Sequence, residues 1–97
     1  MAAPLLRAEW DREIGFFGML RDGQFNESGY HRVERLLETT DRGEGALNRE
    51  FVAVTWYIPI FMTWQRERCL EGGVSAKAYD LAANRLSALV TELLGLP

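Results

Sequence analysis

Cysteine and histidine are scarce in this chain, and their scarcity excludes several kinds of site. Cys69 is the one cysteine, so no internal disulfide can form and nothing indicates an oxidising compartment. His31 is the one histidine, and it falls in a different predicted helix from Cys69. A zinc site needs four ligands, or three and a water, so these two residues are too few. We therefore predict no metal and no other cofactor bound by this chain.

An excess of positive charge is also lacking. The net charge is −3, and acidic and basic residues are mixed along the chain, which excludes the basic footprint of a nucleic-acid-binding protein. The first residues contain no apolar segment of signal-peptide length. The longest apolar run is shorter than the roughly 20 residues that a membrane span needs. We therefore expect a cytoplasmic protein whose partners are neither nucleic acids nor membranes.

No motif typical of a catalytic centre is present either. The glycines at positions 15, 18 and 23 do not form a phosphate loop, because no strand precedes them. Glu34 and Glu38 are a like-charge pair at helical spacing, which is typical of a solvated face. His31 has no nucleophile near it in the sequence, so we interpret it as a surface or capping residue. The chain is expected to have no complete catalytic centre of its own.

What the chain has instead is one long apolar run, FVAVTWYIPIFMTW, at residues 51–64. Its aromatic and β-branched residues are also typical of a buried strand, but no second strand-like run is present to pair with it. We therefore predict a helix from a cap at Asn48 to about Glu71. Pro59 lacks an amide hydrogen, so the helix should bend there. Because this helix is apolar all round, several of its sides must be covered.

Amphipathic patterns on either side of this run predict three more helices. Their ends carry the residue types that cap or stop helices. Gly15 and Gly18 lower the propensity of the first helix by about 1 kcal/mol each and leave a side where another backbone can approach. The expected bounds are residues 5–22 closed by Asp22-Gly23, a helix capped by Asn26 or Ser28 with a loop at 39–45 after it, and a helix from Ser75 to about Leu94. The predicted fold is all-α: one domain, residues 1–97, with about four helices arrayed compactly around a central, Pro-bent apolar helix.

Aromatic residues make up 11% of the chain, a heavy load for its length. They either form the core alone or form the core and a surface for a partner, in which aromatic side chains are the usual anchors. The apolar circumference of the central helix favours the second interpretation. A bend at Pro59 is expected to turn Trp56 and Tyr57 away from Phe61 and Trp64. These four residues are our candidates for contacting a partner or forming the wall of a pocket.

Short motifs follow one another in a recognisable order over about residues 8–86. A tryptophan and an acid precede a glycine and a phenylalanine, and a Val-Glu-Arg segment and a Glu-Gly-Gly-Val turn come later. The positions are Trp10-Asp11, Gly23, Phe25, Val33-Glu34-Arg35, the aromatic pair Tyr57 and Phe61, and Glu71-Gly72-Gly73-Val74-Ser75. Together they resemble the N-terminal helical region of nitrile hydratase beta subunits, the accessory proteins of nitrile hydratases, and the small subunits of thiocyanate hydrolases.

The chain departs from the beta-subunit pattern in several ways. Its loop between Arg35 and Tyr57 is longer, as in the accessory proteins, and its aromatic pair is not adjacent. Beta subunits carry an arginine that hydrogen-bonds oxidised cysteine ligands of the partner's metal, and the matching position here is His31, or Arg32 if a one-residue gap is placed differently. The beta-barrel half of a beta subunit and the C-x-x-C-S-C metal loop of an alpha subunit are both missing.

The resemblance implies a small, non-metal-binding subunit of a nitrile hydratase-type complex, which converts a nitrile to an amide. In such a complex the chain packs on an alpha-type subunit that holds cobalt or iron, helps form the substrate pocket, and has a separate beta-barrel subunit as a possible further partner. Two alternatives stay open. The chain is an accessory protein that assists metal loading of the alpha subunit, or it is a plain helical interaction protein or homodimer without a link to nitriles.

Overall fold

A computed structural model of the protein describes residues 2–40 and 49–95, and every regular element in these ranges is a helix. The all-α prediction is therefore confirmed. The number of helices is larger than expected, because two of the four predicted helices are each divided in two. The six helices in the described ranges are α1 (Ala2–Ala8), α2 (Phe16–Leu20), α3 (Glu27–Thr39), α4 (Arg49–Thr55), α5 (Ile58–Glu71) and α6 (Ala76–Leu94).

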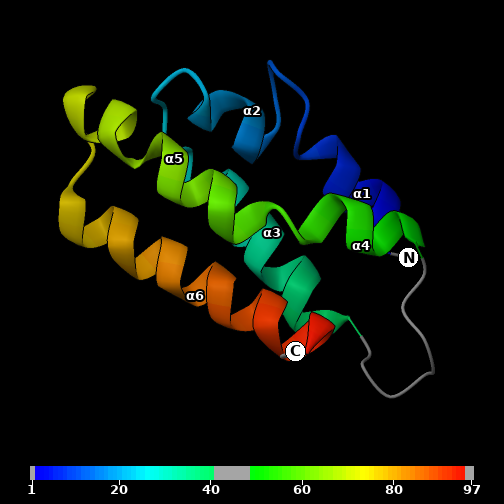
Figure 1. Ribbon diagram of the computed structural model, residues 1–97. Helices are drawn as coiled ribbons and strands as arrows, with labels where there is room; N and C mark the ends of the chain where they lie inside the picture. The colour runs from blue at the N-terminus through cyan, green and yellow to red at the C-terminus, as the bar shows by residue number, and fades with distance from the viewer. Residues whose placement is uncertain (1, 41–48, 96–97) are drawn as a thin grey trace.

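The helices pack around one apolar core (Figure 1). α5 and α6 run antiparallel and side by side, and α3 packs across α6 behind them. α1 lies beside α4 at the other end of the molecule, and α2 lies near α3. Every helix contributes to the core, whose fully buried large side chains include Leu6, Phe16, Phe17, Leu20, Val33, Leu37, Ile58, Met62, Tyr79 and Leu86.

The predicted helix over residues 5–22 is wrong, because a turn separates α1 from α2. The Asp11 carboxylate accepts hydrogen bonds from the backbone amides of Glu13 and Ile14, at 2.9 and 3.1 Å. The Glu9 carboxylate accepts one from the amide of Phe16 at 3.0 Å. Side chains that bond nearby amides in this way offer the backbone an alternative to a continuous helix. Apolar spacing alone did not reveal this competition.

The two glycines of this region admit a neighbouring backbone, as predicted, and that backbone is the preceding turn. A Cβ atom added at Gly18 would lie 1.8 Å from the carbonyl oxygen of Asp11. One added at Gly15 would lie 2.3 Å from the carbonyl oxygen of Glu9. Both distances are far below van der Waals contact, so α2 packs against the turn only because these side chains are absent.

The predicted central helix is also divided, and Pro59 does not lie at a bend within it. α4 ends at Thr55 and α5 begins at Ile58, which places Pro59 in the first turn of a new helix. Proline is favoured there, because the amide that it lacks has no partner within the helix. The buried hydroxyl of Thr55 donates to the carbonyl of Phe51 at 2.8 Å. The predicted cap Asn48 lies outside the described residues, as do residues 41–45 of the predicted loop.

Other predicted helix ends are confirmed. Asn26, not Ser28, caps α3, and its side-chain oxygen accepts from the amide of Gly29 at 2.7 Å. Gly23 has a φ of 78°, the left-handed conformation expected after a helix. Ser75 caps α6 by accepting from the amide of Ala78 at 3.3 Å, and this helix ends at Leu94.

The packing of α5 against α6 determines which face of α5 points outward. Ile58, Met62 and Cys69 are buried on one side of the helix. The hydroxyl of Tyr79 in α6 donates to the carbonyl of Met62 at 2.5 Å, and burial raises the pKa of this tyrosine. The opposite side of α5 is left uncovered by the rest of the chain that the structure describes. None of the described helices combines the length and the hydropathy needed to cross a membrane.

Candidate functional site

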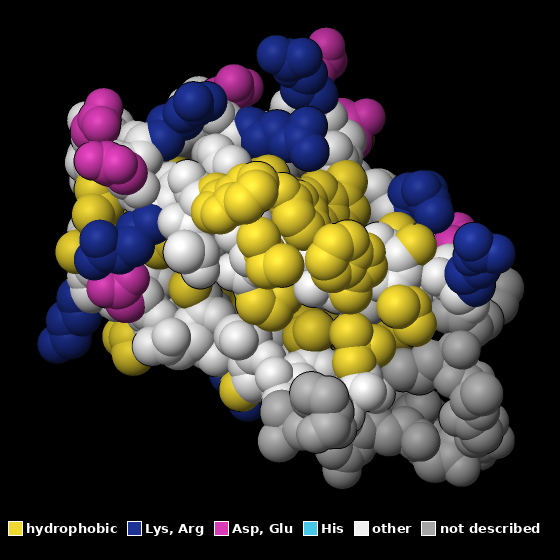
Figure 2. All heavy atoms as spheres, viewed as in Figure 1, with side chains coloured by type: hydrophobic (Ala, Val, Ile, Leu, Met, Phe, Trp, Pro, Cys, Tyr) yellow, Lys and Arg dark blue, Asp and Glu magenta, His cyan; other side chains and the backbone are white. Residues whose placement is uncertain are grey.

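Large apolar side chains are exposed along the junction of α4 and α5. The exposed fractions are 53% for Trp56, 41% for Ile60 and 68% for Trp64, and Tyr57 lies half-buried between them. Figure 2 shows hydrophobic side chains gathered in the middle of this face. We call Trp56, Tyr57, Ile60 and Trp64 the aromatic surface. Single exposed apolar residues are ordinary, whereas large contiguous patches of them are typical of interaction sites, which makes this surface a candidate.

The expected separation of Trp56 and Tyr57 from Phe61 and Trp64 is wrong, because the four residues lie together. The ring centroid of Tyr57 is 5.4 Å from that of Trp56 and 6.0 Å from that of Trp64. Phe61 is also 6.0 Å from Tyr57, but it is only 2% exposed and lies beneath the surface. The cause is the interruption at residues 56–57, which replaces the bend expected at Pro59 and brings the four side chains together.

Trp10 supports the aromatic surface from below. Its indole N–H donates to the carbonyl of Val54 at 3.1 Å, and thereby satisfies one of the free carbonyl groups at the end of α4. Its ring stacks on Phe17 at 4.3 Å and meets the edge of Phe61 at 4.9 Å. The ring of Tyr57 is 6.2 Å away. Tyr57, the half-buried member of the aromatic surface, therefore rests on packed rings.

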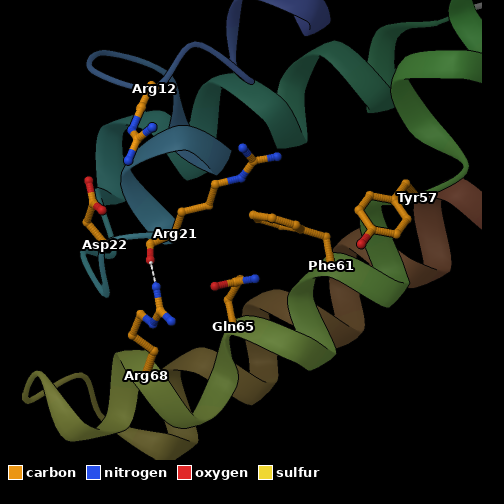
Figure 3. Close-up of a pocket in the computed structure, with 7 residues that line it drawn as sticks. All are labelled: Arg12, Arg21, Asp22, Tyr57, Phe61, Gln65 and Arg68. Carbon is orange, nitrogen blue, oxygen red and sulfur yellow. Dashed lines mark hydrogen bonds between the residues drawn. The ribbon is translucent and has the colours of Figure 1, made fainter.

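A pocket of about 400 Å³ opens beside the aromatic surface, between α2 and α5 (Figure 3). A second pocket, of about 220 Å³, continues along α4 and shares Arg21 and Tyr57 with the first. The first pocket, which we call the arginine pocket, is lined by Arg12, Arg21, Asp22, Tyr57, Phe61, Gln65 and Arg68.

The arginine pocket carries positive charge in a chain whose net charge is −3. The guanidinium carbon of Arg21 lies 5.4 Å from the ring centroid of Phe61, a cation–π contact. Arg68 donates from Nη1 to the carbonyl oxygen of Arg21 at 2.6 Å. Asp22 is the one acidic residue that lines the pocket, against three arginines. Figure 2 shows both basic and acidic side chains around the apolar centre of this face, with basic ones directly beside it.

Arg32 and His31, the candidates for the family's arginine position, lie on α3. Arg32 binds Glu9 through Nε at 2.7 Å and Nη2 at 3.1 Å, and this hydrogen bonding raises the pKa of the arginine. His31 is exposed, 3.9 Å from Glu27 and 3.4 Å from Glu34. It lines a different pocket, between α3 and α6. The structure thus places both candidates outside the aromatic surface.

Cys69 and the charged residues between α3 and α6 have ordinary structural partners. Cys69 is buried, its thiol donates to the carbonyl of Leu20 at 3.8 Å, and burial raises its pKa. Arg85 of α6 bridges Glu34 and Glu38 of α3 at 3.4 and 2.6 Å. Within residues 2–40 and 49–95, no three His, Cys, Asp or Glu side chains are grouped in a way that could hold a metal.

Sequence reasoning missed the arginine pocket. No sequence pattern associates Arg12 with Arg68, whereas in the structure both line one pocket and Arg68 contacts the backbone of Arg21. Arg66, two residues from Arg68 in the sequence, points elsewhere and binds Asp80 of α6 at 2.8 and 3.0 Å. The residues of the pocket come from separate parts of the chain, and no sequence signal joins them. Only the packing of α2 against α5 brings them together.

No family model, no curated protein and no solved structure matches this chain. The resemblance to nitrile hydratase subunits therefore stays a prediction that rests on the motifs. The candidate site consists of an exposed aromatic surface, packed aromatic rings beneath it and a positively charged pocket at its edge.

Proposed function

We propose that this chain is a small, non-metal-binding subunit of a nitrile hydratase-type complex. It packs through the aromatic surface on an alpha-type subunit that holds cobalt or iron, and it helps form the wall of the substrate pocket. The complex converts a nitrile to an amide, with the partner's metal acting on the nitrile or on the attacking oxygen. The observation that carries the proposal is the exposure of Trp56 and Trp64 side by side with Tyr57 on one helical junction.

The composition of this face supports a protein partner. Tryptophan, tyrosine and arginine contribute most to binding energy at protein interfaces, and all three occur here within one area. The partner surface that fits is apolar at its centre and acidic at its edge, because the arginine pocket adjoins the aromatic surface. Such charge complementarity orients the two proteins and speeds their encounter.

The support beneath the surface favours binding without rearrangement. Trp10 is held by a hydrogen bond to Val54 and by stacking on Phe17, and it contacts both Tyr57 and Phe61. A surface that is ordered before binding loses little conformational entropy on association. The aromatic surface is therefore suited to a lasting subunit contact.

Arg32 is the better of the two candidates for a contact with oxidised cysteine ligands in the partner. A guanidinium carries five N–H donors; Glu9 accepts from Nε and Nη2, and the carbonyl oxygen of Ile14 accepts from Nη2 at 3.4 Å, which leaves the donors of Nη1. About half of the Arg32 side chain is exposed, at 49%. In the proposed complex its remaining donors bind the sulfenate or sulfinate oxygens by charge-assisted hydrogen bonds. Glu9 positions the guanidinium for this contact.

Co-expression with the genes adjacent to its own tests the proposed function. We expect the chain to co-purify with a protein that contains a C-x-x-C-S-C motif, in a complex that hydrates nitriles. If the proposal is wrong, size-exclusion chromatography with light scattering would show the chain alone, as a monomer or dimer, without a protein that contains this motif.

The second candidate function is an accessory protein for metal loading, which the long segment between Arg35 and Tyr57 favours. Removal of this chain from the purified, metal-loaded complex separates the two roles. A subunit that forms part of the substrate pocket is needed for every turnover, so its removal should abolish nitrile hydration. An accessory protein is dispensable after maturation, so activity should persist without it.

A further inference from the structure

The arginine pocket contains cations that the described residues leave without a carboxylate partner. Other arginines of the protein form ion pairs, as Arg32 does with Glu9 and Arg66 with Asp80. In contrast, Arg12, Arg21 and Arg68 have no carboxylate oxygen within ion-pair distance in residues 2–40 and 49–95, although they line one pocket. A group of cations with so little compensation is suited to an anionic ligand.

Two of these cations are oriented by contacts that leave their charge uncompensated. Arg21 lies over the ring of Phe61, and Arg68 donates to the carbonyl oxygen of Arg21. Figure 3 shows the side chains of Arg68 and Gln65 reaching from α5 toward α2, whereas the side chain of Arg21 extends along the pocket to the ring of Phe61. The amide of Gln65 supplies further hydrogen-bond donors there. The hydrogen-bond donors of the pocket are therefore in place before a ligand binds.

The chemistry of the lining favours a singly charged carboxylate over a phosphate. A guanidinium binds either group, but Asp22 at the edge of the pocket opposes a dianion more strongly than a monoanion. Tyr57 and Phe61 supply an apolar floor, and Tyr57 also belongs to the aromatic surface. A ligand that fills the site thus combines one carboxylate with an apolar group beside it.

We infer that the arginine pocket binds an acidic side chain of the alpha-type subunit, next to an apolar anchor residue that rests on the aromatic surface. This inference rests on the proposed function for the identity of the partner and adds the chemistry that the partner presents. The carboxylate sets the register of the two proteins, and the apolar anchor contributes the buried area. The ion pair mainly determines which partner binds and in which orientation, because the loss of hydration of the two charges offsets much of their attraction.

Binding of N-acetyl-L-phenylalanine to the isolated chain tests the inference. This probe has one carboxylate beside an aromatic ring, and its primary amide is a neutral control of nearly the same shape. Titrations followed by NMR chemical shifts should give millimolar binding of the carboxylate, about tenfold tighter than the amide, because only the ion forms charge-assisted hydrogen bonds. Added salt should weaken the binding of the carboxylate alone.

Variants identify the site of binding. Arg21→Met should remove the preference for the carboxylate. Arg12→Met should reduce this preference, and because Arg12 lies in an exposed turn, the substitution should leave the fold intact. Arg85→Met is the matched control, because Arg85 pairs with Glu34 and Glu38 away from the pocket. The inference is overturned if the amide binds as well as the carboxylate, or if the preference survives in both pocket variants.

The test also distinguishes other sources of an anion and separates this inference from the proposed function. Inorganic phosphate that binds as tightly as the probe would show a general oxyanion site and overturn the assignment to an acidic side chain. If the probe binds as expected but the chain does not co-purify with a C-x-x-C-S-C protein, the proposed function fails and the carboxylate pocket stands. If the complex forms and the probe shows no preference, the pocket assignment alone fails.

Discussion

Arg32 binds the buried carboxylate of Glu9 through two nitrogen atoms, Nε at 2.7 Å and Nη2 at 3.1 Å. Glu9 is only 6% exposed, and it also accepts a hydrogen bond from the amide of Phe16 at 3.0 Å. The pair therefore joins α3 to the turn between α1 and α2. It fixes the place where the first predicted helix is interrupted, and so the position of α2 against α5.

The Glu9–Arg32 pair should contribute measurably to stability. Arg32→Met leaves a buried carboxylate without its cation and should lower the free energy of unfolding by about 2 kcal/mol. This is less than the 3–5 kcal/mol typical of a fully buried pair, because Arg32 is half-exposed. Urea denaturation measures the loss. The matched control is Arg66→Met, which removes a bidentate pair of similar geometry from the surface and should change stability far less. Equal losses in the two variants would contradict this role.

For Gly18→Ala, helix propensity and tertiary packing predict opposite changes in stability. Helix propensity alone predicts that alanine raises the free energy of unfolding by about 1 kcal/mol. The structure predicts a loss of about 3 kcal/mol, because the new Cβ would overlap the carbonyl oxygen of Asp11 and push α2 from the turn. Thermal unfolding followed by circular dichroism decides between them. Gly73→Ala is the control, since no atom lies within 4 Å of the added Cβ and only the positive φ disfavours it. A stabilised Gly18→Ala variant would refute the close approach.

Tyr30 should make stability depend on pH in the alkaline range. Partial burial, and then the Glu34 carboxylate at 3.2 Å, raise the pKa of Tyr30 from 10.0 to about 12. Because the pKa is higher in the folded state, this contribution is fully present below pH 10 and is lost as the pH rises through 12. Between pH 10 and 12 the free energy of unfolding of the natural protein should fall by on the order of 1 kcal/mol more than that of Tyr30→Phe. The expected difference is this small because solvent screens part of the interaction. Urea denaturation at intermediate pH values measures the difference. Parallel pH profiles for the two proteins would disprove the assignment.

Much of the fold could be predicted from local sequence signals. Asn26 and Ser75 are helix caps, Gly23 takes the left-handed conformation after a helix, and α6 follows its amphipathic pattern to Leu94. These features depend on neighbouring residues, so the sequence contains the information needed. The two interrupted helices were harder to predict. The first is broken by side chains of Glu9 and Asp11 that bond to backbone amides, and apolar periodicity does not report such bonds.

The candidate site was predicted only in part, and for a related reason. Trp56, Tyr57 and Trp64 were identified because they are close in sequence and belong to one apolar run. Their arrangement on one surface was not foreseen, because Pro59 was placed within a helix and not in the first turn of one. The arginine pocket depends on α2 packing against α5, and its cations are spread over residues 12–68. Such a site becomes visible only in three dimensions.

The most direct test of the aromatic surface compares two exposed apolar positions on different faces. Trp56→Ser with Trp64→Ser removes the centre of the surface, and Leu81→Ser removes a side chain of α6 that is 63% exposed. Circular dichroism should show that both variants are folded, since all three side chains are exposed. The measurement is the dissociation constant of each variant with the C-x-x-C-S-C subunit. We predict weakening of about 1,000-fold for the double variant, because two anchor residues contribute about 2 kcal/mol each, and no change for Leu81→Ser. Unchanged affinity of the double variant, or equal weakening by Leu81→Ser, would contradict the proposed interface.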